Sequence, residues 1–239
     1  MTKRIKILCS LVILSLVIVI GGINSYALTT GFSVDDISES EKENIDIDIS
    51  LVSEAPSDKS ISRFDVNENG MIALGHKLPG MSNMISVYDS DGNFKYGYSF
   101  DSYGTFGVEW DGDYLNIYFV RSDLLVTVDC EANIIGIAKI QNTKENNDYG
   151  DYCLYGTERV VGDTKYTIRN RMGVLNFIKS SHSQLVKTSA DGTEIILYDV
   201  NTIQLIKRLL IIFLMFALLG VAIYTIFIKP IRQNKKENI

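Results

Sequence analysis

The stretch "TFGVEWDGDYLNIYFV", from Thr105 to Val120, decides the fold. Two short runs rich in β-branched and aromatic residues lie on either side of "DGD". Such runs favour strands, and Gly112 can adopt the positive φ that a tight turn needs. The stretch therefore predicts an antiparallel hairpin.

The same rhythm of strand and turn continues in both directions along the chain. Turn residues such as "NENG", "SDGN" and "ADGT" separate the runs, which is typical of antiparallel strands. The further strand-like runs are "ISRFDV", "MIALGHK", "MISVYD", "FKYGYSF", "LLVTVD", "IIGIAKI", "TERVV", "KYTIRN", "SQLVKTS" and "EIILYDV". The sequence thus predicts an all-β domain over residues 61–200.

The runs fall into three copies that can be laid over one another. Gly70 matches Gly112 at a spacing of 42, and Asp89 matches Asp129 at a spacing of 40. Further matches pair the two "YGT" triplets at 103–105 and 155–157, and pair Asp91–Gly92 with Asp191–Gly192. A period near 40 residues with four short strands per unit is typical of propeller blades.

These units resemble the blades of secreted β-propellers of the NHL and YVTN type, in strands such as "ISVYDSDGNF". The resemblance covers Ser60 to Val200 and implies antiparallel four-stranded, blade-like repeats. Closed propellers have four to eight blades, whereas this chain has at most three copies. The sheet could stay open, several chains could complete a ring as an oligomer, or the strands could form another antiparallel arrangement.

Two uncharged segments predict contact with a membrane. Residues 209–228 are apolar on all sides and long enough to cross a bilayer, so they predict a transmembrane helix followed by a short basic tail at 229–239. Residues 1–27 combine Lys3, Arg4 and Lys6 with an apolar run and the small-x-small ending "SYA". They predict either a cleavable signal peptide or an N-terminal membrane anchor.

Charge predicts the orientation and excludes one class of partner. Basic residues gather at both ends, and positive charge favours the cytoplasmic side, so the main domain is expected outside the cytoplasm in a single- or double-pass protein of the cell membrane. The chain has 23 basic and 29 acidic residues; removing nine basic residues and Glu237 near the membrane segments leaves 14 and 28, a net charge of −14. Such a surface repels nucleic acid.

The stretch 28–60 is rich in Asp, Glu and Ser and predicts a solvated acidic linker. One island inside it, "IDIDISLV" (residues 45–52), alternates with period two. We expect it to add an edge strand to the domain that follows.

The stretch "DVNENGMIAL", from Asp65 to Leu74, matches the beginning of a calcium-binding loop. The twelfth position of such a loop requires a bidentate Glu, but here it is His76, and the flanks have strand rather than helix character. We therefore interpret Asn69–Gly70 as a hairpin turn that the Asp65 side chain caps, and expect no metal site.

Catalytic chemistry finds little support in the sequence. His76 and His182 are the only histidines, one near a strand end and one in the polar loop "SSHS", and both are expected to be strand-end or surface residues. The carboxylates that a glycosidase-like mechanism could use lie mostly in turns, where acidic residues are usual: Glu109, Asp111, Asp113 and Asp129. We expect no catalytic, metal or cofactor-binding residues.

Three smaller features complete the prediction. Trp110 is expected to pack between neighbouring sheets, and the tyrosine-rich stretch "NDYGDYCLYGTERV" to serve packing rather than a ligand groove. Cys130 and Cys153 could form a disulfide or stay unpaired. Ala217 and Gly220 give only a weak signal for helix dimerisation.

The function predicted is a membrane-anchored extracytoplasmic module that binds or senses a protein or small ligand. Repeat-like β surface is present and a catalytic set is absent, which favours binding over catalysis. The alternatives are an accessory subunit of a membrane complex and a carboxylate-dependent surface hydrolase. The high content of Lys, Asn and Ile suggests a bacterial source of low genomic GC content.

Overall fold

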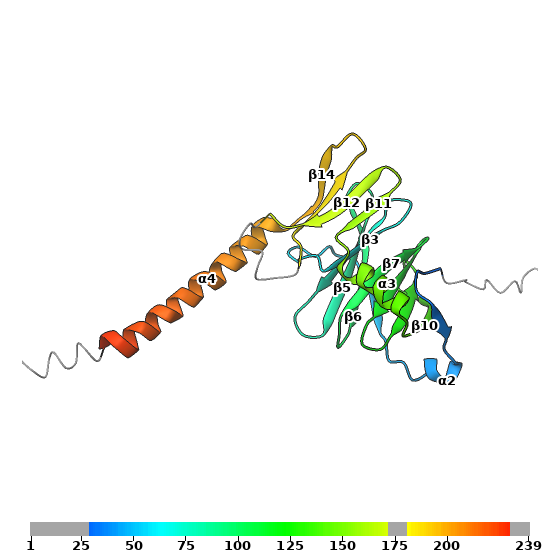
Figure 1. Ribbon diagram of the computed structural model, residues 1–239, viewed down its shortest axis with the longest axis horizontal. Coiled ribbons are helices and arrows are strands. Elements are labelled where there is room, and N and C mark those ends of the chain that lie inside the picture. Colours follow the sequence, from blue (N-terminus) through cyan, green and yellow to red (C-terminus); the bar gives the residue numbers. More distant parts are fainter. Residues whose placement is uncertain (1–28, 172–180, 230–239) are drawn as a thin grey trace, which may run out of the picture.

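The computed structural model describes residues 29–171 and 181–229. The predicted signal peptide or anchor at 1–27, and the basic tail beyond residue 229, lie outside the described residues. Within those ranges the chain forms three antiparallel sheets and ends in a long helix that extends away from them (Figure 1).

Each sheet contains four strands that are consecutive in the chain and antiparallel to their neighbours, and two of the sheets gain a fifth strand from the N-terminal part of the chain. The first sheet has the order β2-β6-β5-β4-β3, with β2 (Ile49–Val52), β3 (Arg63–Val66), β4 (Ile72–Lys77), β5 (Ser82–Tyr88) and β6 (Phe94–Asp101). The second sheet has the order β1-β10-β9-β8-β7, with β1 (Val34–Asp36), β7 (Phe106–Asp111), β8 (Tyr114–Phe119), β9 (Leu124–Val128) and β10 (Ile134–Ile140). The third sheet runs in sequence order through β11 (Glu158–Val161), β12 (Thr164–Arg169), β13 (Gln184–Thr188) and β14 (Glu194–Asp199).

The antiparallel strands predicted for residues 61–200 are confirmed, and so is the edge strand expected within 45–52. That strand is β2, which pairs with β6 through Ile49–Phe100 and Val52–Gly97. The repeat and propeller-like resemblance stay predictions. The fold is mainly rather than wholly β, because α2 (Glu39–Lys42) and α3 (Lys144–Tyr155) interrupt the strands.

The stretch predicted to be a flexible acidic linker is ordered where it is described. It contributes β1, α2 and β2, and β1 is an edge strand that pairs with β10 from Val34–Ile140 to Asp36–Ala138. A strand at a sheet edge needs few apolar side chains, because its backbone hydrogen bonds fasten it while its outer side chains stay in water. The acidic composition therefore did not exclude structure.

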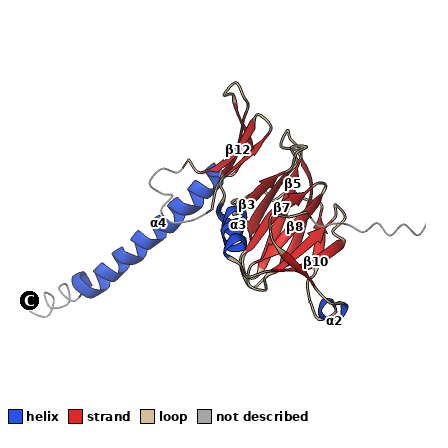
Figure 2. Ribbon diagram, turned by 45° about the vertical axis from the view of Figure 1, so that its right-hand side comes forward, coloured by secondary structure: helices blue, strands red, loops and turns tan. Residues whose placement is uncertain are grey.

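The first sheet lies between the other two and shares one apolar core with each (Figure 2). The core against the second sheet includes Ile85 and Tyr98 from the first sheet and Phe106, Ile117 and Val126 from the second. Side chains from alternate positions of β3 and β4 turn to the opposite face and meet the third sheet; that second core comprises Phe64, Val66, Ile72, Leu74, Tyr166, Ile168 and Leu185. Because both faces of the first sheet are buried there, β4 is apolar at the successive positions Ile72, Ala73 and Leu74.

The first hairpin of every sheet turns on a glycine in the left-handed region. Gly70, Gly112 and Gly162 have φ values of 76°, 59° and 56°. At the third hairpin, Gly92 and Gly192 have φ of 85° and 82°, and Ala132 occupies the corresponding place at 68°. Gly70 and Gly112 thus lie in first hairpins and Gly92 and Gly192 in third hairpins, whereas the matched triplets at 103–105 and 155–157 lie outside the hairpins. The turn predicted at Asn69–Gly70 is confirmed.

The C-terminal helix α4 (Asn201–Ile223) continues into the π-helical turn η2 (Tyr224–Ile228). Its stretch Asn201–Ile226 is long and apolar enough to cross a membrane, and its most apolar 18-residue window is not buried against the rest of the described protein. Phe213 and Phe216 are 71% and 69% exposed, and they belong to a continuous apolar surface. A helix that faces water rarely has such a surface. The helix begins two turns before the predicted segment 209–228, and those two turns contact the β region.

Candidate functional site

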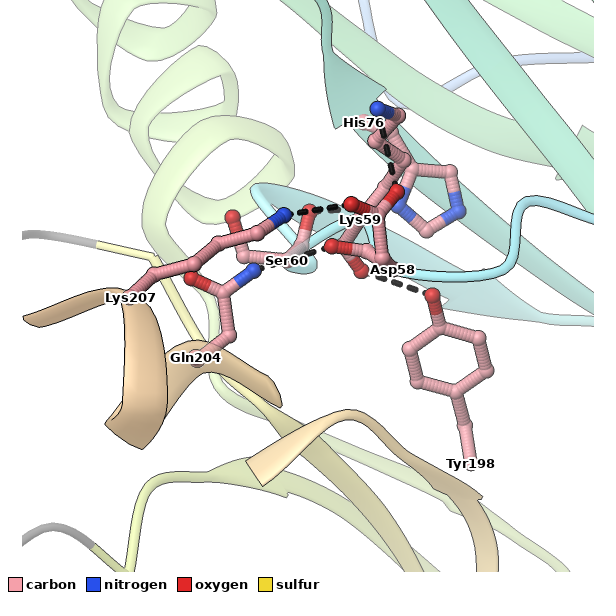
Figure 3. Close-up of polar contacts among 7 residues, drawn as sticks. All are labelled: Asp58, Lys59, Ser60, His76, Tyr198, Gln204 and Lys207. Carbon is pink, nitrogen blue, oxygen red and sulfur yellow. Dashed lines mark hydrogen bonds and ion pairs between the residues drawn. The ribbon is translucent and has the colours of Figure 1, made fainter. Parts of the chain in front are cut away.

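The first turns of α4 dock onto the segment that precedes β3 (Figure 3). Gln204 Nε2 donates a hydrogen bond to the carbonyl oxygen of Asp58 at 3.0 Å, and Lys207 Nζ pairs with the Asp58 carboxylate. Lys59 Nζ lies 3.1 Å from the other Asp58 oxygen. Asp58 thus joins the helix to the sheets with both its backbone and its side chain.

The same segment also contacts side chains of the third and first sheets (Figure 3). The Tyr198 hydroxyl, from β14, donates to the carbonyl oxygen of Lys59 at 2.6 Å. His76 Nδ1, from β4, lies 3.1 Å from the carbonyl oxygen of Ser60. We call Asp58, Lys59, Ser60, His76, Tyr198, Gln204 and Lys207 the helix-docking site.

His76 is fully buried, so it is near a strand end as expected but is not a surface residue. The carbonyl of Ser60 can only accept, so Nδ1 carries the proton and Nε2 accepts from Ser86 Oγ at 2.7 Å. Burial disfavours the charged ring and lowers the pKa of His76 to about 4. The hydrogen bond from Lys207, and to a lesser extent that from Lys59, lowers the pKa of Asp58 below its usual value.

A buried ion pair lies where α3 meets the three sheets. Arg159 Nε, at the start of β11, donates to Asp65 Oδ1 at 2.7 Å, and the backbone N–H of Trp110 donates to Asp65 Oδ2 at 2.8 Å. The Arg159 guanidinium stacks over the Tyr152 ring at 4.0 Å from its centroid. Burial raises the pKa of Asp65, and the charge of Arg159 opposes that change.

The Asp65 side chain therefore does not cap its hairpin, contrary to the sequence interpretation. Asn67 does so instead, because its Oδ1 accepts from the N–H groups of Asn69 and Met71 at 3.0 and 2.8 Å. Asp89 and Asp129 hold their own turns in the same way, through the N–H groups two and four residues on.

Two of the carboxylates considered for a hydrolase mechanism, Glu109 and Asp111, accept hydrogen bonds from the protein's own residues. Glu109 accepts from Thr30 Oγ1 at 2.6 Å, from the N–H of Gly31 at 3.0 Å and from the Tyr149 hydroxyl at 2.5 Å. Asp111 accepts from the N–H of Thr29 at 2.7 Å. Both fasten the N-terminal segment 29–31, while Asp129 lies in the β9–β10 turn and Asp113 in the β7–β8 turn.

A pocket of about 610 Å³ lies where strand ends of the first and second sheets meet. Tyr103, 77% exposed, and Arg121, from the β8–β9 turn, line it together with the segment 44–47. Asp46 and Asp101 line the pocket as well, so it combines an aromatic ring with charges of both signs and is suited to a small polar ligand with a flat face. Tyr103 entered the sequence analysis only as part of a repeated triplet, and Arg121 did not enter it.

The remaining sequence predictions have clear outcomes. Trp110 packs against the core shared by the first and second sheets, as expected. Cys130 is exposed and Cys153 is buried, and both are free thiols; burial raises the pKa of Cys153 to about 12. The tyrosine-rich stretch forms α3, whose Tyr149 ring contacts Phe32. In the described ranges, no cluster of His, Cys, Asp or Glu side chains has the arrangement of a metal site.

Sequence reasoning missed the helix-docking site because its partners are far apart in the chain. Asp58 and Lys207 are 149 residues apart, and neither is part of a motif. A usable signal was the polar start of α4, where Gln204 and Lys207 precede an otherwise apolar run.

No family model matches this chain, and a search of curated proteins found no match either.

Proposed function

We propose that this protein is a membrane-anchored extracytoplasmic module that binds or senses a ligand or partner, and that transmits the state of its sheets to α4 through the helix-docking site. The observation that carries the proposal is the fastening of an exposed apolar helix to the β region. A flexible tether would need no such contacts.

The connection is short as well as fastened. Only Val200 separates the end of β14 from the start of α4, and its N–H donates to the carbonyl of Ser183 at 2.9 Å. The first turns of the helix then bind the segment before β3, so α4 is joined to both the third and the first sheet. A change in the relative position of these sheets would therefore act on the helix directly.

The pocket at Tyr103 and Arg121 is the best candidate for the ligand site. It lies at strand ends of the first two sheets, so a ligand bound there would contact both. A binding module also explains the carboxylates better than a surface hydrolase does, since Glu109 and Asp111 are engaged with the protein's own segment 29–31. An accessory subunit that assembles through α4 is the second candidate, because the most apolar 18-residue window of the helix is not buried against the described residues.

The experiment measures both orientation and coupling. Protease added to intact cells is expected to remove the β region, and digestion only after lysis would refute the proposal. For coupling, spin labels at Cys130 and at a new cysteine, Leu210→Cys, in a Cys9→Ser background are expected to give one narrow distance distribution in lipid nanodiscs.

Two variants separate docking from a general loss of charge. Asp58→Asn combined with Lys207→Met should broaden that distribution, because the helix loses its ion pair. Lys165→Met removes an equally exposed lysine that pairs with Glu158 at 2.7 Å, and it should leave the distribution narrow. Equal distributions in all three proteins would contradict transmission through the helix-docking site.

A further inference from the structure

Arg63, in β3, is buried without a counter-ion among the described residues. Its Nε donates a hydrogen bond to the carbonyl oxygen of Phe106 at 2.7 Å, and its Nη1 donates to the carbonyl oxygen of Ser62. Both acceptors are uncharged, and the residue is only 9% exposed. A guanidinium carries five N–H donors, so the other N–H groups of Arg63 have no acceptor in the described part of the chain. Arg63 therefore has both an unpaired charge and unused donors.

Arg159, which contacts the same helix α3, shows what such a side chain needs. It is 4% exposed and, like Arg63, it donates to two backbone carbonyl oxygens and lies over a tyrosine ring. Arg159 also pairs with Asp65 at 2.7 Å, whereas no described carboxylate lies within ion-pair distance of Arg63. Burial lowers the pKa of Arg63, because water no longer stabilises its charge. Buried charges in proteins are normally paired, so an anion from outside the described chain would stabilise this site.

Arg63 lines a pocket of about 280 Å³. Lys77, at the end of β4, and His182, just before β13, line it as well, and its described lining includes no Asp or Glu. The chain without the charges that flank its membrane segments has a net charge of −14. In so acidic a protein, a pocket that gathers basic side chains and contains no carboxylate is suited to an anion.

The fold places the other two basic side chains beside Arg63. Gly75 pairs with Arg63 across β3 and β4, and Lys77 is two residues further along β4, so Lys77 and Arg63 lie on the same face of the first sheet. His182 exchanges two backbone hydrogen bonds of 2.7 Å with Ile61, two residues before Arg63. Its Nδ1 is buried and has no hydrogen-bond partner in the described protein. A buried polar atom without a partner needs an explanation, and a hydrogen-bonding group bound in this pocket provides one.

A phosphate group fits this arrangement better than a carboxylate does. The donors come from three elements, namely β3, β4 and the residues before β13. The tetrahedral oxygens of phosphate accept hydrogen bonds from several directions, whereas the two oxygens of a carboxylate lie in one plane. Arginine and lysine are the usual phosphate-binding side chains of proteins. Leu154 and Ile168 also line the pocket, so a short organic part of the ligand could lie against them.

The pocket lies near the base of α4. Ser183, which follows His182, donates from its hydroxyl to Asn201 Oδ1 at 3.0 Å, and Asn201 is the first residue of the helix. The segment predicted to cross the membrane starts at Leu209, about 12 Å further along the helix. A phosphate on a lipid headgroup is therefore one source of the ligand, and a small soluble phosphate compound is the other.

We propose that the pocket at Arg63, Lys77 and His182 is a binding site for a phosphate group, which serves as the counter-ion of Arg63. Binding is non-covalent: Arg63 and Lys77 donate charged hydrogen bonds, and His182 adds a further donor. This pocket shares no lining residue with the pocket at Tyr103 and Arg121. The inference therefore does not rest on the proposed function, and either can fail without the other.

The experiment follows the thermal unfolding of the full chain in a neutral detergent at pH 7. Sodium phosphate is added in steps, with sodium chloride of the same ionic strength as the reference. A ligand that binds only the folded state raises the melting temperature as its concentration rises, so we expect a rise with phosphate that chloride does not give. In a second arm, phosphatidylglycerol is added to the micelles, with the phosphate-free lipid diacylglycerol as the reference.

Three variants show whether the response comes from this pocket. Lys77→Met removes one charge from an exposed side chain and should raise the apparent dissociation constant of the responding probe about tenfold, as expected for one charged hydrogen bond. Arg63→Met should abolish the response. Lys165→Met removes an exposed lysine that pairs with Glu158 and should leave the response unchanged. If Arg63→Met fails to fold, the comparison of Lys77→Met with Lys165→Met decides.

The two arms also separate the sources of the phosphate group. A response to phosphatidylglycerol alone would identify a lipid headgroup, and a response to inorganic phosphate alone would identify a soluble compound. A response in both arms that Lys77→Met weakens would support the site with either source. No response in either arm, or a response that is equal in the wild type and in Lys77→Met, would overturn the proposal.

Discussion

Replacing Asp65 by Asn should destabilise the protein more than any other isosteric change of a single charge. The Arg159 side chain is 4% exposed and that of Asp65 14%, so the variant leaves a cation buried without its counter-ion. Breaking a buried pair on one side costs about 3–5 kcal/mol. Arg159 keeps hydrogen bonds to the carbonyl oxygens of Glu158 and Tyr152 and its stacking on Tyr152, which places the expected loss near 3 kcal/mol.

The assay is urea unfolding of the full chain in mild detergent, followed by tryptophan fluorescence. Trp110 is the only tryptophan, and its backbone N–H binds Asp65, so the reporter lies at the perturbed site. A loss of 3 kcal/mol would lower the urea midpoint by about 1 M or more. Asn retains an acceptor for the Trp110 N–H, which isolates the effect of the charge.

A double-mutant cycle with Arg159→Met decides whether the pair is coupled. The double variant removes both charges, so it should be more stable than the sum of the single losses predicts, by about 2 kcal/mol. The control Glu158→Gln breaks the exposed pair with Lys165 and should cost no more than about 0.5 kcal/mol. Additive single effects, or a loss below about 1 kcal/mol for Asp65→Asn, would refute the reasoning.

Three further changes test other parts of the structure. The pKa of His76 is about 4 in the folded protein and 6.5 in the unfolded chain, so the unfolded chain takes up a proton first as the pH falls. The free energy of unfolding should therefore fall by up to about 3 kcal/mol between pH 6.5 and pH 4, and urea titrations of His76→Gln should lack this part of the pH dependence. Ala132→Gly should stabilise the protein by about 0.5–1 kcal/mol in thermal melts, because Ala132 has φ of 68° where the other two sheets have glycine; a lower melting temperature would contradict this. Gly92→Ala should lower the free energy of unfolding by about 2 kcal/mol or more in the same melts, because Gly92 has φ of 85° and a Cβ would lie 2.9 Å from the Leu197 carbonyl oxygen. An unchanged melting temperature would show that the turn can shift.

The strands were predictable because each is specified locally. Period-two patterns and turn residues fixed where β3 to β14 begin and end, and the hairpin glycines fixed their connections. The edge strand β2 was also visible, since Ile45 to Val52 alternates within an acidic stretch. These features depend on neighbours within about ten residues.

The helix α3 was missed although its start carries a signal. Thr143 is the N-cap, and its hydroxyl accepts from the N–H of Asn146 at 3.2 Å, a pattern readable from the sequence. The helix is rich in Asn, Asp and Tyr and contains Gly150, so its propensity is low. Packing of Cys153 and Tyr149 against the second sheet stabilises it, and that contact has no local signature.

The candidate sites were beyond sequence reasoning for a related reason. Arg159 meets Asp65 across 94 residues, and Glu109 meets Gly31 across 78. Nothing near either residue marks its partner. The sequence identified the carboxylates considered for a hydrolase mechanism, but only the fold shows that Glu109 and Asp111 bind the chain's own segment 29–31.

The path of the N-terminal segment has a consequence for biosynthesis. The backbone N–H of Ser33 donates a hydrogen bond to Asn146, 113 residues later, and β1 pairs with β10, the last strand of the second sheet to be synthesised. A ribosome therefore releases the opening residues long before their partners exist, and closing so large a loop slows folding. The second sheet, with its N-terminal segment in place, can therefore be completed only after β10 and the start of α3 have been synthesised.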